Sequence, residues 1–353
     1  MHVAAVGSAF PPHFYDQETL IRAFEVAWGA THHNTARVRR MHQAVLVGGR
    51  HLALPLQDYL TLTGFGARND AFIRVALDVA EEAVNDALTQ AGLTVTDVDA
   101  IFSASVTGIA TPSIDARLFH RMGLRPDIVR TPIFGLGCVA GAAGLARLND
   151  WLLGHPDGVA VLLCVELCSL TIQREDFSVA NLVASGLFGD GGAAVVCVGK
   201  DRAARMGLGG PTVVATRSRM YPDSERVMGW DIGDDGFKVI LDKSVPDVVT
   251  TYMRDDVDGF LAENGLTRAD IGSWVCHPGG PKVLDAFEST LEIPKSALDL
   301  TWRSLQREGN MSSASVLFVL RDTLAQARPE PGTWGMMLAM GPGFCSELVL
   351  LRW

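Results

Sequence analysis

The sequence has no long hydrophobic run and no pattern typical of an N-terminal signal segment. Its strongest apolar stretch, 159–165, is far shorter than the roughly 20 residues that a membrane-spanning helix needs. Residues 1–10 instead have the composition of a β-strand. The sequence therefore predicts a protein without a membrane segment, and a cytoplasmic location.

Basic charge is also scarce. Charged residues make up 20% of the 353 residues, and 40 acidic side chains against 30 basic ones give a net charge of −10. Such a balance argues against a surface that binds nucleic acid or an anionic membrane. An anionic ligand would need a local cluster of cations, and Arg37, Arg39 and Arg40 form one.

Cysteine is present without the spacing of a secreted disulfide framework, because the six cysteines are scattered along the chain. This usage is typical of a reducing compartment. Cys164 and Cys168 lie four residues apart, but no two further metal ligands are suitably spaced. We therefore predict core thiols and no metal site. Low-complexity segments and short repeats are lacking as well.

What the chain does have is an alternation of helical and buried strand patterns, with 48% hydrophobic residues. Two βαβαβ series predict a mostly parallel, layered α/β fold with two halves, 1–208 and 209–353, joined near the polar, Gly-rich segment 200–210. The segment 223–236 is predicted to be a loop. Helices are expected over 71–91, 117–122, 141–153, 246–263, 282–291 and 312–327. Strands are expected over 98–104, 158–166, 193–198, 271–276, 335–340 and 346–352.

Cys138 is the candidate nucleophile. It follows Gly137 on the turn between an extended run and the helix 141–153. A sulfur at a helix N-terminus feels the positive end of the helix dipole, which lowers its pKa and favours the thiolate. The surrounding glycines and alanines leave open space, which a substrate could occupy.

Two further polar residues complete a candidate catalytic set. His277 follows the strand 271–276 and precedes Pro-Gly-Gly-Pro, so it lies at a strand end. Asn310 precedes the helix 312–327, where an asparagine is also a good helix cap. A thiol, an imidazole and a carboxamide in this order indicate covalent acyl chemistry.

A competing pattern is the dinucleotide fingerprint G-x-G-x-x-A, formed by residues 135–140. Glu166, at the end of the next strand, would then bind a ribose as in a nicotinamide-dependent dehydrogenase. Pro132 interrupts the preceding strand, however, and the thiol of Cys138 would face the pyrophosphate.

Four motifs together resemble the type III polyketide synthases of the chalcone and stilbene synthase family. They are Gly-Cys-Val-Ala-Gly at 137–141, Leu-Phe-Gly-Asp-Gly at 187–191, His-Pro-Gly-Gly-Pro at 277–281 and Gly-Asn-Met-Ser-Ser-Ala at 309–314. Their order and spacing cover nearly the whole chain. The resemblance implies a thiolase fold, which is a five-layer αβαβα sandwich of two similar halves, acting as a homodimer.

The resemblance also implies roles. Cys138 would accept an acyl group from acyl-CoA, while His277 and Asn310 would bind the thioester carbonyl of malonyl-CoA and stabilise the enolate left by decarboxylation. CoA thioesters would be the substrates, and no metal or redox cofactor would be needed. Phe188 would gate the cavity, and Val239 would replace a second gating aromatic.

The resemblance assigns further positions to the cavity, the dimer contact and the CoA phosphates. Thr111 would reach across the dimer, and the arginine cluster 37–40 would lie near the CoA phosphates. The cavity positions implied by the family's spacing are Val106, Thr107, Cys168, Thr171, Trp230 and Ser312.

Within the family, the segment 229–237 is similar to that of bacterial members that make alkylpyrones and alkylresorcinols. We therefore expect a fatty acyl-CoA starter extended with malonyl-CoA. One alternative uses malonyl-CoA alone and gives a polyhydroxynaphthalene. Another is an initiating ketoacyl synthase, which performs one extension on an acyl carrier protein.

Overall fold

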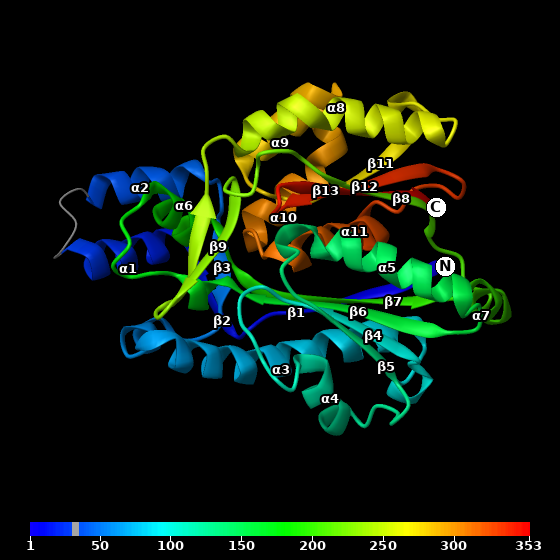
Figure 1. Ribbon diagram of the computed structural model, residues 1–353, viewed down its shortest axis with the longest axis horizontal. Coiled ribbons are helices and arrows are strands. Elements are labelled where there is room, and N and C mark those ends of the chain that lie inside the picture. The colour runs from blue at the N-terminus through cyan, green and yellow to red at the C-terminus, as the bar shows by residue number, and fades with distance from the viewer. Residues whose placement is uncertain (30–34) are drawn as a thin grey trace.

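The computed structural model describes residues 1–29 and 35–353. Within these residues, nine strands form one sheet in the order β11-β12-β13-β8-β1-β7-β6-β4-β5 (Figure 1). Five strands belong to the first half of the chain: β1 (His2–Ala9), β4 (Ala100–Ala104), β5 (Val129–Ile133), β6 (Val159–Leu167) and β7 (Asp190–Val198). Four belong to the second half: β8 (Thr212–Met220), β11 (Ile271–Cys276), β12 (Trp334–Gly341) and β13 (Cys345–Arg352).

The two halves repeat one pairing pattern. In the first, β1 is antiparallel to β7, β7 is antiparallel to β6, and β6 is parallel to β4. In the second, β8, β13, β12 and β11 pair in the same way. The prediction of a mostly parallel sheet is therefore wrong. The short connection between β12 and β13 leaves no room for a crossover, so these strands form a hairpin.

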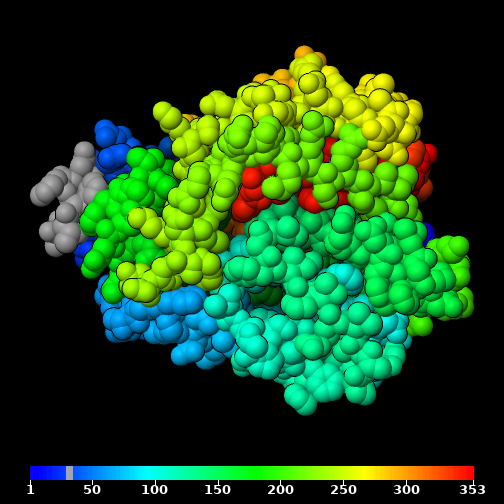
Figure 2. All heavy atoms as spheres, viewed as in Figure 1, coloured from blue at the N-terminus to red at the C-terminus, as the bar shows by residue number. Residues whose placement is uncertain are grey.

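Helices lie on the outer faces of the sheet and between its halves (Figure 1). Helices α3 (Gly64–Ala91) and α4 (Ile114–Met122) cover the first half, while α8 (Val245–Glu263) and α9 (Pro281–Leu291) cover the second. Between the halves lie α5 (Ala140–Gly154) and α11 (Ser315–Gln326). Every residue of β6 is buried, as expected for a strand covered on both faces. Figure 2 shows little of the red C-terminal strands on this face of the molecule.

The remaining elements gather mainly at one end of the sheet. They are α1 (Gln17–Gly29), β2 (His13–Asp16), α2 (Thr35–Ala44), β3 (Gly49–Leu52), α6 (Val179–Leu187), β9 (Met228–Gly233), β10 (Gly236–Leu241) and α10 (Asp299–Glu308). Strands β9 and β10 form a hairpin. Part of the segment 223–236 is therefore strand β9 and not a loop. The polar and Gly-rich composition of the segment concealed this strand in the sequence.

The expected join between the halves falls in the loop between α7 (Lys200–Met206) and β8. The two halves of the sheet meet through a single residue pair, His2 of β1 opposite Thr212 of β8. In the part of the chain that the structure describes, no helix combines the length and the apolar character required to cross a membrane.

Candidate active site

Cys138 lies in a single 3-10 turn, Gly137–Val139, which leads directly into α5. Gly137 has φ +54°, and a Cβ atom there would come within 2.6 Å of Cδ of Pro342. The turn therefore requires glycine, for both its backbone conformation and its packing. The Cys138 side chain is buried, and its Sγ lies 3.6 Å from Oγ of Ser312.

Asn310 is fixed by its backbone and by its side chain. Its N–H donates to the carbonyl of Leu187 at 3.0 Å, and its own carbonyl accepts from the N–H of Gly189 at 2.9 Å. Its Oδ1 accepts from the N–H of Ser312 at 2.8 Å, while Nδ2 donates to the carbonyl of Gly279 at 3.2 Å. The residue thus holds the next turn, as a cap does, and this contact fixes which way its amide N–H groups point.

One cavity of about 370 Å³ brings the three candidates together, because Cys138, His277 and Asn310 all line it. Phe188 lines the same cavity, as do residues of α2 and α6. The backbone N–H of His277 donates to Leu338 at 2.8 Å, and both ring nitrogens are buried without a hydrogen-bond partner in the described residues. No hydrogen bond joins the Cys138 sulfur to this ring, and catalytic contacts of this kind often tighten only when substrate binds.

Burial acts on the protonation of both Cys138 and His277. It raises the pKa of the Cys138 thiol to about 12, with the nearby Glu166 raising it further and the Ser312 hydroxyl opposing this. Burial also lowers the pKa of His277 to about 3. Burial therefore favours a thiol and a neutral imidazole at rest, and opposes the thiolate that the helix dipole favours. The resting thiolate stays a prediction.

Glu166 is not a ribose ligand. Its carboxylate is fully buried and accepts hydrogen bonds from Thr107 Oγ1 at 2.9 Å, from the N–H of Val106 at 3.1 Å and from the Ser313 hydroxyl. This leaves no access for a nucleotide. The dinucleotide-binding interpretation of residues 135–140 is therefore wrong, and Glu166 instead links both halves of the chain behind Cys138.

Apart from Phe188, the residues predicted for the cavity, Ser312 included, are not among those that line the cavity of Cys138. Val106 and Thr107 follow β4, and Cys168 and Thr171 lie in the turn after β6; all four are buried. Trp230 and Val239 face each other across the β9–β10 hairpin but do not line the cavity of Cys138.

The pair two residues further along the hairpin, Met228 and Leu241, does line this cavity, and the sequence analysis missed it. The alternation of side chains along a strand could have identified Leu241, which is two residues from Val239 on the same face.

The arginine cluster lies on α2, beside cavity-lining residues of that helix. Arg39 is committed to Glu18 and Glu25, with nitrogen–oxygen distances of 2.9 and 2.8 Å. Arg40 is exposed and Arg37 half-buried, and neither lines the cavity. The cations that do line it are the exposed Lys243 and Lys282, which the sequence analysis missed although Lys282 directly follows the 277–281 motif.

Thr111 is exposed and precedes a cis bond to Pro112. All six cysteines are buried and unpaired, and Cys164 belongs to the core.

Comparison with known proteins covers the whole chain. The family models for the N-terminal and C-terminal domains of chalcone and stilbene synthases match residues 1–202 and 212–353. The chain is 56% identical to 1,3,6,8-tetrahydroxynaphthalene synthase of Streptomyces peucetius subsp. caesius, over 99% of this chain and 93% of that protein. It is 35% identical to a putative chalcone synthase of Bacillus subtilis, over 99% and 98%.

Solved structures agree with these matches. The crystal structure of 1,3,6,8-tetrahydroxynaphthalene synthase from Streptomyces coelicolor A3(2) matches with a TM-score of 0.90 and 30% identity, covering 100% of this chain and 99% of that chain. The mixed α/β fold is thus the thiolase-like fold of that enzyme class. The chain belongs to the chalcone and stilbene synthase family of type III polyketide synthases, which are acyltransferases acting on CoA thioesters.

Proposed function

We propose that this protein uses malonyl-CoA as both starter and extender and makes a polyhydroxynaphthalene. The observation that carries the proposal is the 56% identity, over nearly the full length, to a 1,3,6,8-tetrahydroxynaphthalene synthase. Enzymes with the same name from Streptomyces coelicolor and Streptomyces griseus are 34% and 31% identical. A naphthalene skeleton can be built wholly from malonyl-derived two-carbon units, so no separate acyl chain is needed.

These relatives favour the alternative over the alkylpyrone or alkylresorcinol product that the sequence predicts first. The fatty acyl-primed reaction remains the second candidate, and the segment 229–237 is the observation that favours it. Both reactions use the same catalytic residues and differ in the group first loaded on Cys138.

In the loading step, the Cys138 sulfur attacks the thioester carbonyl of the CoA substrate. The thiol proton passes to His277, which is neutral at rest and has ring nitrogens without a hydrogen-bond partner in the described residues. The C–S bond to CoA breaks, and the CoA thiolate takes the proton from His277 as it leaves. The neutral resting pair is therefore a competent starting state.

In the extension step, malonyl-CoA loses CO2 and its thioester oxygen gains negative charge. An N–H of His277 and the Asn310 amide are the donors proposed for this oxygen, and a donor of this kind contributes roughly 3 kcal/mol. The enolate carbon then attacks the acyl carbon on Cys138 and releases its sulfur. The lengthened chain, now on CoA, reloads onto Cys138 for the next cycle.

The exposed lysines at the cavity, Lys243 and Lys282, together with Arg40, supply cations for the CoA phosphates in this proposal. The proposal also includes a five-layer sandwich of two halves, 1–208 and 209–353. It further includes a homodimer with Thr111 at the contact between the two copies. Light scattering of the purified protein tests the dimer.

Incubation of the purified protein with malonyl-CoA alone tests the function. We expect an aromatic polyhydroxynaphthalene, identified by mass and ultraviolet spectrum, and the same product when fatty acyl-CoAs are added. The Cys138→Ala variant is the control and should give none. No product from malonyl-CoA alone, with pyrones or resorcinols formed from fatty acyl-CoAs, would instead establish the second candidate.

A further inference from the structure

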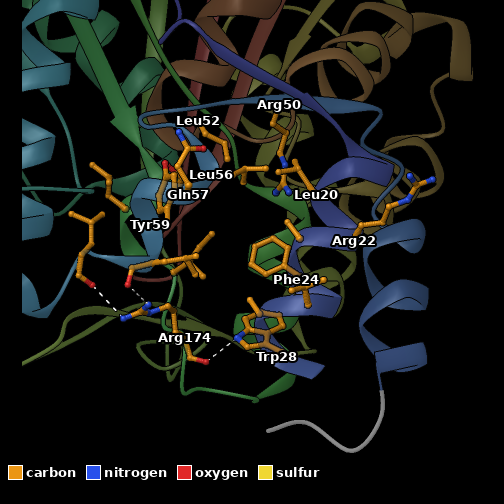
Figure 3. A pocket seen from close by; sticks show the side chains of 18 of the residues that line it. Leu20, Arg22, Phe24, Trp28, Arg50, Leu52, Leu56, Gln57, Tyr59 and Arg174 are labelled. Atoms are coloured by element: carbon orange, nitrogen blue, oxygen red, sulfur yellow. Dashed lines mark hydrogen bonds between the residues drawn. The ribbon is translucent and has the colours of Figure 1, made fainter. Parts of the chain in front are cut away.

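A second cavity, of about 420 Å³, lies between α1, the turn Leu56–Leu60 and the loop that follows Thr171 (Figure 3). It shares no lining residue with the cavity of Cys138. Its wall is mostly apolar and includes Leu20, Phe24, Trp28, Leu52, Leu56 and Ile172. This volume lies within the range of roughly 300–1,000 Å³ that is typical of small-molecule sites.

A buried cation points into this apolar cavity. Arg50 of β3 is only 1% exposed, and Figure 3 shows its guanidinium beside Leu20 and Leu56. Its Nη1 donates to the carbonyls of Ser185 at 2.7 Å and Phe188 at 3.0 Å, while its buried Nε has no hydrogen-bond partner. An unpaired buried charge is costly, so this group calls for an anion.

The protein itself does not supply that anion. Within the described residues, Arg50 forms no salt bridge, although the charge of Asp190 acts on it from a distance. The oxygens of Asp190 are already engaged by the N–H groups of Ala53 and Ser169 and by the Ser169 hydroxyl. Burial lowers the pKa of Arg50 to about 10, so the guanidinium stays charged at neutral pH.

The other charges around the cavity are positive too. Arg68 and Arg174 line it, and their guanidiniums donate to the backbone carbonyls of Ile172 and Leu60 rather than to carboxylates. Arg22 points away and pairs with Glu18. In the described part of the chain, no aspartate or glutamate lines this cavity, although the protein has a net charge of −10.

We propose that this cavity binds an unbranched aliphatic carboxylate, with the head group on Arg50 and the chain along Phe24 and Trp28. The Nη2 group of Arg50 offers charged N–H donors to a carboxylate, while Nη1 is held by the carbonyls of Ser185 and Phe188. One water molecule occupies roughly 30 Å³ in the liquid. At this volume for each non-hydrogen atom, the cavity of about 420 Å³ holds about fourteen such atoms. A chain of about ten to twelve carbons therefore fits.

The opening supports the same class of ligand. Val26 and Leu60 line the cavity and are 82% and 61% exposed, so an apolar rim faces the solvent. Exposed apolar side chains around a hollow are typical of ligand sites. The charge deep inside selects an ionised head group over a neutral one, and over the apolar side chain of a protein partner.

Isothermal titration calorimetry of the full chain with decanoate, decan-1-ol and butanoate tests the proposal. We expect one decanoate per chain, bound at least tenfold more tightly than decanol, and no measurable binding of butanoate. Ala23→Trp, on the cavity side of α1, should abolish binding, whereas the matched Ala204→Trp on the exposed face of α7 should not. Circular dichroism and thermal unfolding of both variants establish that they fold.

Several results would overturn the proposal. Equal affinity for decanoate and decanol would remove the role of Arg50. Unchanged binding by Ala23→Trp, with loss in Val183→Trp, would place decanoate in the cavity of Cys138, which Val183 lines. Binding to anionic phospholipid vesicles without binding of monomeric decanoate would indicate a membrane surface instead. Because the two cavities share no lining residue, the effect of Ala23→Trp on decanoate binding and the identity of the polyketide product are tested independently.

Discussion

Two influences act on the Cys138 sulfur in opposite directions. It lies in the turn directly before α5, at the positive end of the helix dipole, and the Ser312 hydroxyl lies 3.6 Å away. The surrounding protein removes water, and this desolvation prevails, which raises the pKa to about 12. In the proposed mechanism, we therefore expect nucleophilic attack to depend on proton transfer to His277 during the reaction, and less on a standing thiolate.

Alkylation of Cys138 by iodoacetamide should reveal this protonation state. Because only the thiolate reacts, the labelling rate should be low at pH 7 and rise about tenfold per pH unit up to pH 9. Mass spectrometry of digested protein separates Cys138 from the other five cysteines. A rate that reaches a plateau below pH 8 would instead show a stable ion pair with His277.

Removal of the sulfur should separate the two half-reactions. Cys138→Ala should abolish acyl transfer to the protein yet retain release of CO2 from malonyl-CoA, because the proposed donors His277 and Asn310 remain. Radiolabelled malonyl-CoA measures both quantities. Continued extension of acyl chains by this variant would show that another residue is the nucleophile.

Substitution of Asn310 by aspartate tests the proposed donor role of its amide more directly. Asn310→Asp keeps the oxygen that accepts from the Ser312 N–H and loses the amide donor, together with its hydrogen bond to the Gly279 carbonyl. We expect CO2 release to fall about 10²- to 10³-fold. Asn310→Ala, which also loses the contact with Ser312, should be at least as slow. Undiminished release by Asn310→Asp would refute the donor role.

At the scale of elements, glycines allow the site-bearing segments to approach one another. A Cβ atom on Gly141 of α5 would lie 2.4 Å from the carbonyl oxygen of Ser313. One on Gly189 would lie 2.6 Å from that of Glu308. The glycines of these motifs are therefore explained by backbone contacts between segments far apart in the sequence.

Substitution of Gly141 should separate these segments. Gly141→Ala must push α5 away from the turn Ser312–Ala314, and we expect a loss of about 1–3 kcal/mol in the free energy of unfolding, with a large loss of activity. Gly66→Ala in α3 is the matched control, since a Cβ there meets nothing within 4 Å, and it should stabilise slightly. Urea unfolding compares them, and equal stability of the two variants would contradict the packing argument.

Elements with strong apolar patterns could be predicted closely from the sequence. Strand β11 has the predicted bounds 271–276, and α5 extends the predicted 141–153 by one residue at each end. Helix α3 begins seven residues earlier than predicted, because Gly64 and Gly66 in its first turn obscured the pattern. Helix α2 was missed because its charged face leaves a narrow apolar stripe, with Val38 and His42 buried.

For the site, the motifs predicted four residues that line one cavity, Cys138, Phe188, His277 and Asn310, but not the protonation of Cys138 and His277. Burial decides the latter, and burial depends on packing between the two halves of the chain. The prediction that Val239 and Trp230 line the cavity was wrong for a related reason. The register of the β9–β10 hairpin relative to the cavity is set by contacts with α6 and the turn at 168–171, which no local pattern encodes.

At the scale of the whole molecule, Glu166 joins the two halves. It lies on β6 of the first half and accepts a hydrogen bond from Ser313 of the second, besides those from Val106 and Thr107. Burial raises its pKa from 4.5 to about 7, although these donors oppose the shift. The folded protein thus holds a proton here that the unfolded chain releases.

The stability contributed by this proton is complete below pH 4.5 and is lost as the pH rises through 7. Glu166→Gln cannot titrate, so the wild type should lose more free energy of unfolding than this variant between pH 4.5 and 8, by on the order of 3 kcal/mol. Urea unfolding of both proteins at several pH values measures this difference in free energy. The contributions of the other buried titratable groups are the same in both proteins and cancel. Parallel pH profiles would show that Glu166 is ionised throughout.

The backbone bridge between residues 188 and 310 couples two properties that an enzyme engineer would want to vary independently. Trimming the Phe188 ring leaves its peptide group in place, so we expect the choice of starter to change while decarboxylation persists. Insertions or proline substitutions around 187–189 would displace Asn310 through its hydrogen bonds to Leu187 and Gly189. Libraries aimed at new products should accordingly diversify this strand end by side chain and leave its main chain intact.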